Sequence, residues 1–126
     1  MSEQRTGSAT AFGTNDVMSA IEFQEELRRY ARFNLRPPVE NPLVAAVQKI
    51  CDNPAFAQSR LLSRILTALT HERGEFRRAE AAALDAATLA IAIALMNAAR
   101  AGTTARDDWI KAVSACDAAL GASASA

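Results

Sequence analysis

Residues 79–101 read Ala-Glu-Ala-Ala-Ala-Leu-Asp-Ala-Ala-Thr-Leu-Ala-Ile-Ala-Ile-Ala-Leu-Met-Asn-Ala-Ala-Arg-Ala, and this stretch decides the fold. Between Ala86 and Ala99, only Thr88 and Asn97 interrupt a series of apolar and mostly small side chains. A helix that is apolar on every side must be covered on every side, so the rest of the chain or a second copy has to surround it. The stretch therefore predicts a bundle built around one alanine-rich buried helix.

The composition of the whole chain agrees with a helical bundle. The chain has 126 residues, enough for one domain that buries roughly two-thirds of its unfolded surface. Half of the residues are apolar and the net charge is zero, which excludes the disordered class. Alanine is abundant while aromatic residues make up only 6% of the chain, which favours helix over sheet. We predict an all-α, compact single domain of five to six short helices.

The first helix is predicted from an apolar stripe near the N-terminus. It should begin after Thr14 or Asn15, whose side chains can cap the free amides of a first turn. It should end before Pro37, because proline disfavours helical geometry in the residue that precedes it. The stripe recurs every three or four residues: Ala20, Phe23, Leu27 and Tyr30.

Two asparagines that each precede a proline predict the next two helix starts. Asn41 and Asn53 can cap a helix whose first position is proline, where the missing amide costs nothing. The helices should cover about 42–51 and 54–72, and Gly74 is placed to end the second of them.

The remainder of the chain is predicted to form two or three further helices. Segment 75–101 is either one helix or two, and we favour two with a break near Asp85, which is a good cap. Gly102 closes this run before a last helix with a spaced apolar stripe: Trp109, Val113, Cys116 and Leu120. The chain then divides into three parts: a flexible tail over 1–13, a helical domain over 14–120 and a flexible tail over 121–126.

No residue pattern in the sequence indicates a catalytic or metal site. His71 is the only histidine, whereas a zinc-protease helix needs two histidines four residues apart. It falls in the last turn of its predicted helix, where a partly positive imidazole complements the helix dipole. Glu72, Glu75 and Glu80 are interleaved with arginines and fit a solvated, mixed-charge surface. We expect no metal and no cofactor.

The two cysteines, Cys51 and Cys116, are predicted to be small buried side chains on the apolar faces of their helices. Their low number fits a reducing compartment, and we expect a cytoplasmic location. The sequence shows no signal peptide, and the alanine-rich run is too short and too interrupted to span a bilayer. We therefore expect no contact with a membrane.

Nucleic-acid binding is the main alternative that the charges suggest. Residues 53–78 carry five arginines against two glutamates: Arg60, Arg64, Arg73, Arg77 and Arg78. Residues 77–96 also have the outline of a helix-turn-helix. The second helix of that pair, however, offers Ala, Leu, Ile and Met, whereas base recognition needs polar side chains that reach into the groove.

A second row of arginines, Arg28, Arg32 and Arg36, recurs every four residues and could hold a phosphate or an acidic partner. Together with Arg73, Arg77 and Arg78, these arginines are the interaction residues that the sequence suggests.

We expect a small helical protein-binding module of adaptor or regulatory type, without catalytic activity. Its partner is a protein of unknown identity, and the surplus of apolar surface favours a homodimer. The alternatives are a nucleic-acid-associated regulator that uses the arginines at 60–78, and a small enzyme or small-ligand carrier in which His71 is the candidate acid–base residue.

Overall fold

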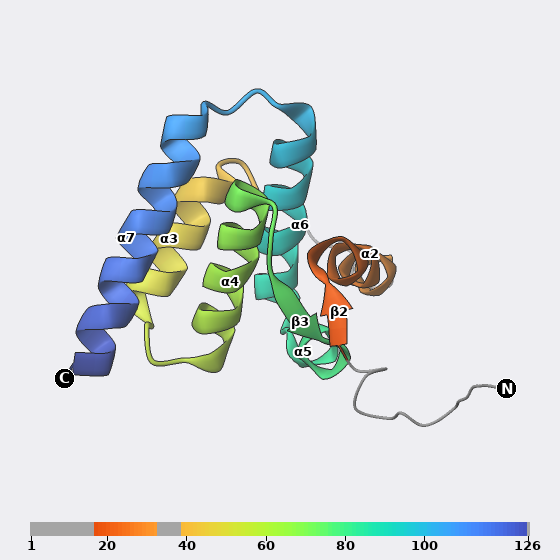
Figure 1. Ribbon diagram of the computed structural model, residues 1–126, viewed down its shortest axis with the longest axis horizontal. Helices are drawn as coiled ribbons and strands as arrows, with labels where there is room; N and C mark the ends of the chain where they lie inside the picture. The colour runs from red at the N-terminus through yellow and green to blue at the C-terminus, as the bar shows by residue number, and fades with distance from the viewer. Residues whose placement is uncertain (1–16, 33–38, 126) are drawn as a thin grey trace, which may run out of the picture.

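The computed structural model describes residues 17–32 and 39–125, and the description below is confined to them. Within these residues the chain forms six helices and one two-stranded sheet, which confirms the predicted all-α bundle (Figure 1). The elements in chain order are β2 (Val17–Ser19), α2 (Ala20–Ala31), α3 (Pro42–Asp52), α4 (Ala57–His71), β3 (Glu75–Arg77), α5 (Arg78–Ala83), α6 (Ala86–Ala101) and α7 (Arg106–Ser125). None of these helices combines the length and the apolarity that crossing a membrane requires.

Four helices, α3, α4, α6 and α7, form the bundle and contain most of the core. Figure 1 shows α7 beside α3 and α4, and α2 on the opposite side of α6. The alanine-rich helix α6 packs against α2, α3 and α4, and no residue from Thr88 to Met96 is exposed. Ile91 and Ile93 are only partly buried. The helix is therefore covered over most of its circumference but not over all of it. The small alanine side chains allow the neighbouring helices to approach closely.

The start of the chain differs from the prediction. β2 replaces the expected first helical turn after Thr14 or Asn15, and it pairs antiparallel with β3 in the register Met18↔Phe76. Helix α2 begins only at Ala20, because Ser19 and Glu22 form a reciprocal capping box there. The predicted stripe is otherwise confirmed: Phe23 and Leu27 are buried. The sheet could not be foreseen because its strands are three residues long and far apart in sequence.

The predicted boundaries of the third and last helices also need correction. Asn53 does not cap α4, because residues 54–56 form an irregular turn and the helix begins at Ala57. The helix ends at His71 and is capped by Glu72, which adopts left-handed geometry with φ 55°, two residues before the expected Gly74. Helix α7 continues to Ser125 through the predicted tail, since Gly121 lies outside the positive-φ region and alanine favours helix.

Other predicted boundaries are confirmed. Asn41 caps α3 by accepting a hydrogen bond from the Val44 amide. Segment 75–101 does contain a break at Asp85, whose carboxylate accepts from the Thr88 amide at 2.7 Å. Gly102 ends α6 in left-handed geometry, with φ 68°. Local capping chemistry therefore positions two of the four bundle helices, α3 and α6, where the sequence expects them, because each cap acts within a few residues of its partner.

Candidate functional site

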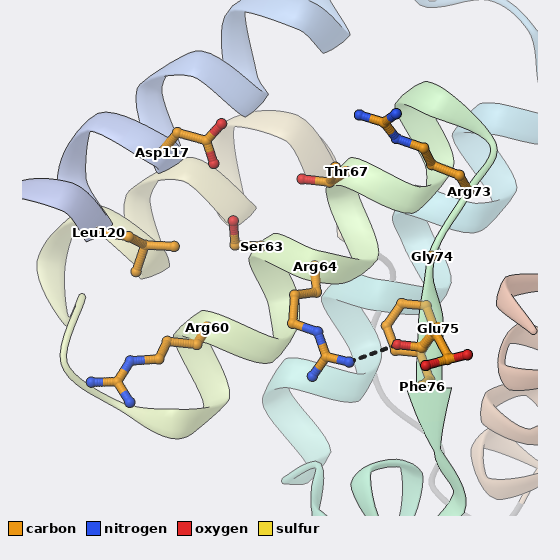
Figure 2. Close-up of a pocket in the computed structure, with 10 residues that line it drawn as sticks. All are labelled: Arg60, Ser63, Arg64, Thr67, Arg73, Gly74, Glu75, Phe76, Asp117 and Leu120. Atoms are coloured by element: carbon orange, nitrogen blue, oxygen red, sulfur yellow. Dashed lines mark hydrogen bonds between the residues drawn. The ribbon is translucent and has the colours of Figure 1, made fainter. Parts of the chain in front are cut away.

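A groove lies between α4, the segment that leads into β3, and α7 (Figure 2). Its volume is about 540 Å³, within the range of sites that hold small molecules or single anchoring side chains. The lining residues are Arg60, Ser63, Arg64, Thr67, Arg73, Gly74, Glu75, Phe76, Asp117 and Leu120.

Helix α4 supplies one wall of the groove through a single helical face. Arg60, Ser63, Arg64 and Thr67 follow one another at steps of three, one and three residues, so all four project from the same side of the helix. Figure 2 shows the Ser63 and Thr67 hydroxyls directed into the hollow between α4 and α7. This wall therefore offers hydroxyl groups at its centre and a guanidinium group at one end.

Arg64 fixes the opposite wall to α4. Its guanidinium group donates to the Glu75 carbonyl oxygen at 2.8 Å and forms an ion pair with Glu80. It also lies over the Phe76 ring, 5.0 Å from the ring centroid. Burial raises the pKa of Glu80, but hydrogen bonds from Arg64 and the Arg77 backbone outweigh this effect and leave the pKa below its usual value. Arg64 is thus a structural clamp with little capacity left for a ligand.

Arg60 and Arg73 are the two uncommitted cations of the groove. Both are exposed, and neither forms an ion pair with any described residue. Glu75 and Asp117 lie on the rim between the cations, so positive and negative groups alternate around the opening (Figure 2). Phe76 and Leu120 provide apolar surface between these charges.

The predicted interaction residues do not form one patch. Of the three predicted interaction residues at 73–78, only Arg73 lines the groove. Arg78 instead pairs with Glu26 of α2 at 3.4 Å. Arg77 is exposed on β3 and does not line the groove. Of the five arginines in 53–78, Arg64 and Arg78 are therefore paired with the carboxylates of Glu80 and Glu26, which lie outside that segment.

The second predicted row of arginines is also dispersed. Arg28 donates to the Asn97 side-chain oxygen on α6 at 3.0 Å, while Arg32 follows the last turn of α2 and is exposed. Arg36 lies outside the described residues.

The remaining candidates take structural positions. His71 is the last residue of α4 and is exposed, where a cation complements the helix dipole. Cys116 is buried as predicted, and burial together with nearby Cys51 and Asp117 raises its pKa to about 11. Its thiol is therefore protonated at neutral pH. The prediction for Cys51 is wrong: it is exposed, because it falls in the last turn of α3 beyond the covered face.

The helix-turn-helix outline exists, but its second helix is not available to DNA. Helices α5 and α6 flank a break at Leu84 and Asp85. Because α6 packs against three other helices, its middle turns cannot enter a major groove. In the described part of the chain, Glu72, Glu75 and Glu80 do not join other ligands in a group that could hold a metal ion.

Sequence reasoning missed the residues that complete the groove. The spacing of Arg60, Ser63, Arg64 and Thr67 was a readable signal for one polar face on α4. No local signal brings Asp117 or Phe76 to that face, since their approach depends on how α7 and β3 pack.

Comparisons of the chain with protein-family models, curated proteins and solved structures gave no match. The function is therefore inferred from the groove itself.

Proposed function

We propose that the protein is a non-catalytic helical module whose groove between α4, β3 and α7 binds a short segment of a partner protein. The observation that carries this proposal is the pair of uncommitted cations, Arg60 and Arg73, on the rim of a groove with apolar walls. An apolar side chain of the partner would contact Leu120, while its carboxylates would contact the two arginines.

The alternation of charge on the rim favours a protein over a nucleic acid. A nucleic-acid backbone is uniformly negative and would meet Glu75 and Asp117 as well as the arginines. A peptide can carry both signs, and so can match the rim charge by charge. The pairing of Arg64 with Glu80 and of Arg78 with Glu26 further reduces the cations that are free for phosphates.

A binding role without catalysis is supported by the position of the titratable groups. His71, the only histidine, lies at the end of α4 and does not line the groove. The buried thiol of Cys116 is held protonated, which makes it a poor nucleophile. The proposal includes a cytoplasmic location, with which two free cysteines are compatible.

The experiment begins with gentle purification of the tagged protein from its native host and identification of a stoichiometric partner. Binding of that partner is then titrated against the double variant Arg60→Glu and Arg73→Glu. We expect at least about tenfold weaker binding, because two attractive contacts become repulsive. The matched control is Arg77→Glu with Lys49→Glu, which changes the net charge equally at positions that line neither this groove nor the one between α3 and α7. Equal affinity of the two double variants would reject the groove as the binding site.

We also propose that the protein self-associates. A second groove, of about 1010 Å³, lies between α3 and α7, and Val44 on its rim is 57% exposed. Asp108 and Lys111 carry opposite charges on the same groove, so two copies related by a two-fold axis could pair them reciprocally. Light scattering at micromolar concentration should give the mass of two chains, and Val44→Glu should give the mass of one. A wild-type mass of one chain would reject the dimer.

A further inference from the structure

A group of hydrogen-bond donors lies at the contact between α2 and α6, away from the groove. Arg28 of α2 donates through Nη1 to Oδ1 of Asn97 on α6, at 3.0 Å. This bond occupies the amide oxygen of Asn97 and leaves its NH₂ group, which only donates, on an exposed side chain. The guanidinium group of Arg28 likewise has further N–H groups and no acceptor.

Arg100 adds a second cation to the same place. It follows Asn97 by three residues on α6, so the two side chains share a helix face. Burial lowers the pKa of Arg28, and the positive charge of Arg100 lowers it further. The two guanidinium groups are therefore near enough to repel each other across the contact between the helices.

No carboxylate within the described ranges neutralises these cations. Arg28, Arg32 and Arg100 form no ion pair there, and Glu26 is already engaged by other arginines. Glu25, one turn before Arg28, forms no ion pair either. The patch thus contains two adjacent positive charges and several free donors without a matching acceptor.

We propose that Arg28, Asn97 and Arg100 form a binding site for a phosphate group. Guanidinium groups bind the oxygens of phosphate in a bidentate manner, and a tetrahedral anion can reach donors from two helices at once. Arg32, the C-cap of α2, follows Arg28 by four residues and could bring a further cation to the same anion. This inference is independent of the proposed groove, which shares none of these residues.

These arginines have one competing role. Arg28 lies in the last turn of α2 and Arg100 in the last turn of α6, where cations offset the negative ends of the helix dipoles. If this were their only role, the two arginines would stabilise the fold without binding an anion. A test must therefore measure anion binding and folding separately.

The test uses the full chain and inorganic phosphate, titrated at constant ionic strength with chloride as the balancing ion. Nuclear magnetic resonance follows the side-chain amide of Asn97 and the Nε–H groups of the arginines. We expect saturable shifts, and affinity that falls about fivefold or more in Arg28→Gln and in Arg100→Gln. Arg77→Gln, a change of the same charge at an exposed residue of β3 that lines neither proposed site, should leave the phosphate affinity unchanged.

The variant Asn97→Asp separates binding from folding. Aspartate keeps an oxygen acceptor for Arg28, so the contact between α2 and α6 is retained and the melting temperature should not fall. The added negative charge should nevertheless abolish phosphate binding. Phosphate binding by Asn97→Asp that equals that of the wild type would overturn the proposal, and so would wild-type shifts that do not saturate.

Two further ligands test whether the site prefers a tetrahedral anion and which kind of molecule carries the phosphate group. Acetate at the same concentration should bind more weakly than phosphate, and equal binding of acetate would overturn the assignment to a tetrahedral anion. Tighter binding of O-phosphoserine than of inorganic phosphate would support the proposal and indicate that the natural ligand is a phosphorylated side chain. Equal or weaker binding of O-phosphoserine would support the proposal and indicate that the natural ligand is free inorganic phosphate.

Discussion

Two parts of the molecule share one apolar core but contribute to it unequally. The bundle of α3, α4, α6 and α7 is joined by apolar side chains that are completely buried, among them Ile50, Leu62, Leu66 and Leu95. The second part, which we call the outer unit, consists of β2, α2, β3 and α5. It contributes Leu27 and the stacked rings of Phe23 and Phe76, 4.2 Å apart, to the same core, and adds ion pairs and a short strand pairing.

The charged contacts of the outer unit involve few residues. Glu26 accepts from Arg29 and Arg78, and so connects α2 to the start of α5. The pair of Arg64 and Glu80 connects α5 to the bundle. Partly exposed ion pairs contribute little stability compared with buried apolar surface. Because the bundle helices supply most of the buried apolar side chains, we expect the outer unit to open locally before the bundle does.

Both proposed sites lie on the boundary between these two parts. The groove has one wall from β3 and two from the bundle helices α4 and α7. The phosphate site combines Arg28 of the outer unit with Asn97 and Arg100 of α6. A ligand at either site would hold the outer unit against the bundle and thereby stabilise the less stable part.

The largest expected effect is a loss of bundle packing. Leu66→Ala should lower the free energy of unfolding by about 2–5 kcal/mol, because Leu66 is fully buried on α4 and its removal leaves a cavity. Urea unfolding measures this change. Ile21→Ala, at a residue that is 70% exposed, is the control and should change stability by no more than about 0.5 kcal/mol. Similar losses in the two variants would contradict the idea of a rigid core around α4.

Loss of the aromatic stack should affect the outer unit selectively. Phe76→Leu keeps apolar volume but removes the ring that stacks on Phe23, at a cost of about 0.5–1.5 kcal/mol. Hydrogen exchange should accelerate at the amides of β2 and α2 while the amides of α6 keep their protection. Phe56→Leu, at a ring that is 62% exposed, is the matched control. Equal acceleration in α6 would show that the two parts open together.

The difference between the bundle and the outer unit also explains which structural features could be predicted from the sequence. In the bundle, caps and apolar stripes act within one or two turns, so Asn41, Asp85 and Gly102 could be placed correctly from local pattern. In the outer unit, β2 pairs with a strand about sixty residues away, as Met18 does with Phe76. Such a contact has no local signal when the strands are only three residues long.

The candidate groove is predictable to a similar degree. The polar face of α4 that carries Arg60 and Thr67 follows from helical spacing. The pairing of Arg64 with Glu80 and the approach of Asp117 depend on tertiary packing. For this reason the sequence suggested a patch of excess positive charge, whereas the structure has alternating charges.

The connection between bundle and outer unit should respond to a backbone change. Glu72 follows α4 with φ 55°, a left-handed conformation that costs a non-glycine residue about 1–2 kcal/mol. Glu72→Gly should therefore stabilise the protein by about 0.5–1 kcal/mol, after the extra freedom of glycine in the unfolded chain is subtracted.

Gly102→Ala is the matched variant, and we expect it to lower the free energy of unfolding where Glu72→Gly raises it. Gly102 has φ 68°, and an added Cβ would meet no atom within 4 Å, so only backbone strain contributes to the loss of stability. Thermal unfolding of both variants measures the two effects. Destabilisation by Glu72→Gly would mean that the Glu72 side chain contributes more than its backbone strain costs.

The smallest expected effect concerns the ion pair that joins α5 to the bundle. The pKa of Glu80 is lowered in the folded protein, so its contribution to stability is present above the unfolded pKa of about 4.3 and is lost as the pH falls through the folded value. Glu80→Gln should therefore lower stability at pH 7, by less than about 1 kcal/mol because the pair is partly exposed.

The difference between wild type and Glu80→Gln should shrink as the pH falls from about 5 to 3, since both side chains are then neutral. Urea unfolding at several pH values measures it, and the same pH-dependent difference should be smaller in an Arg64→Gln background, where the partner is absent. A difference that persists at low pH would mean that Glu80 acts through hydrogen bonds that survive protonation. The outer unit would then be attached by directional contacts, and its attachment to the bundle would resist acid as well as salt.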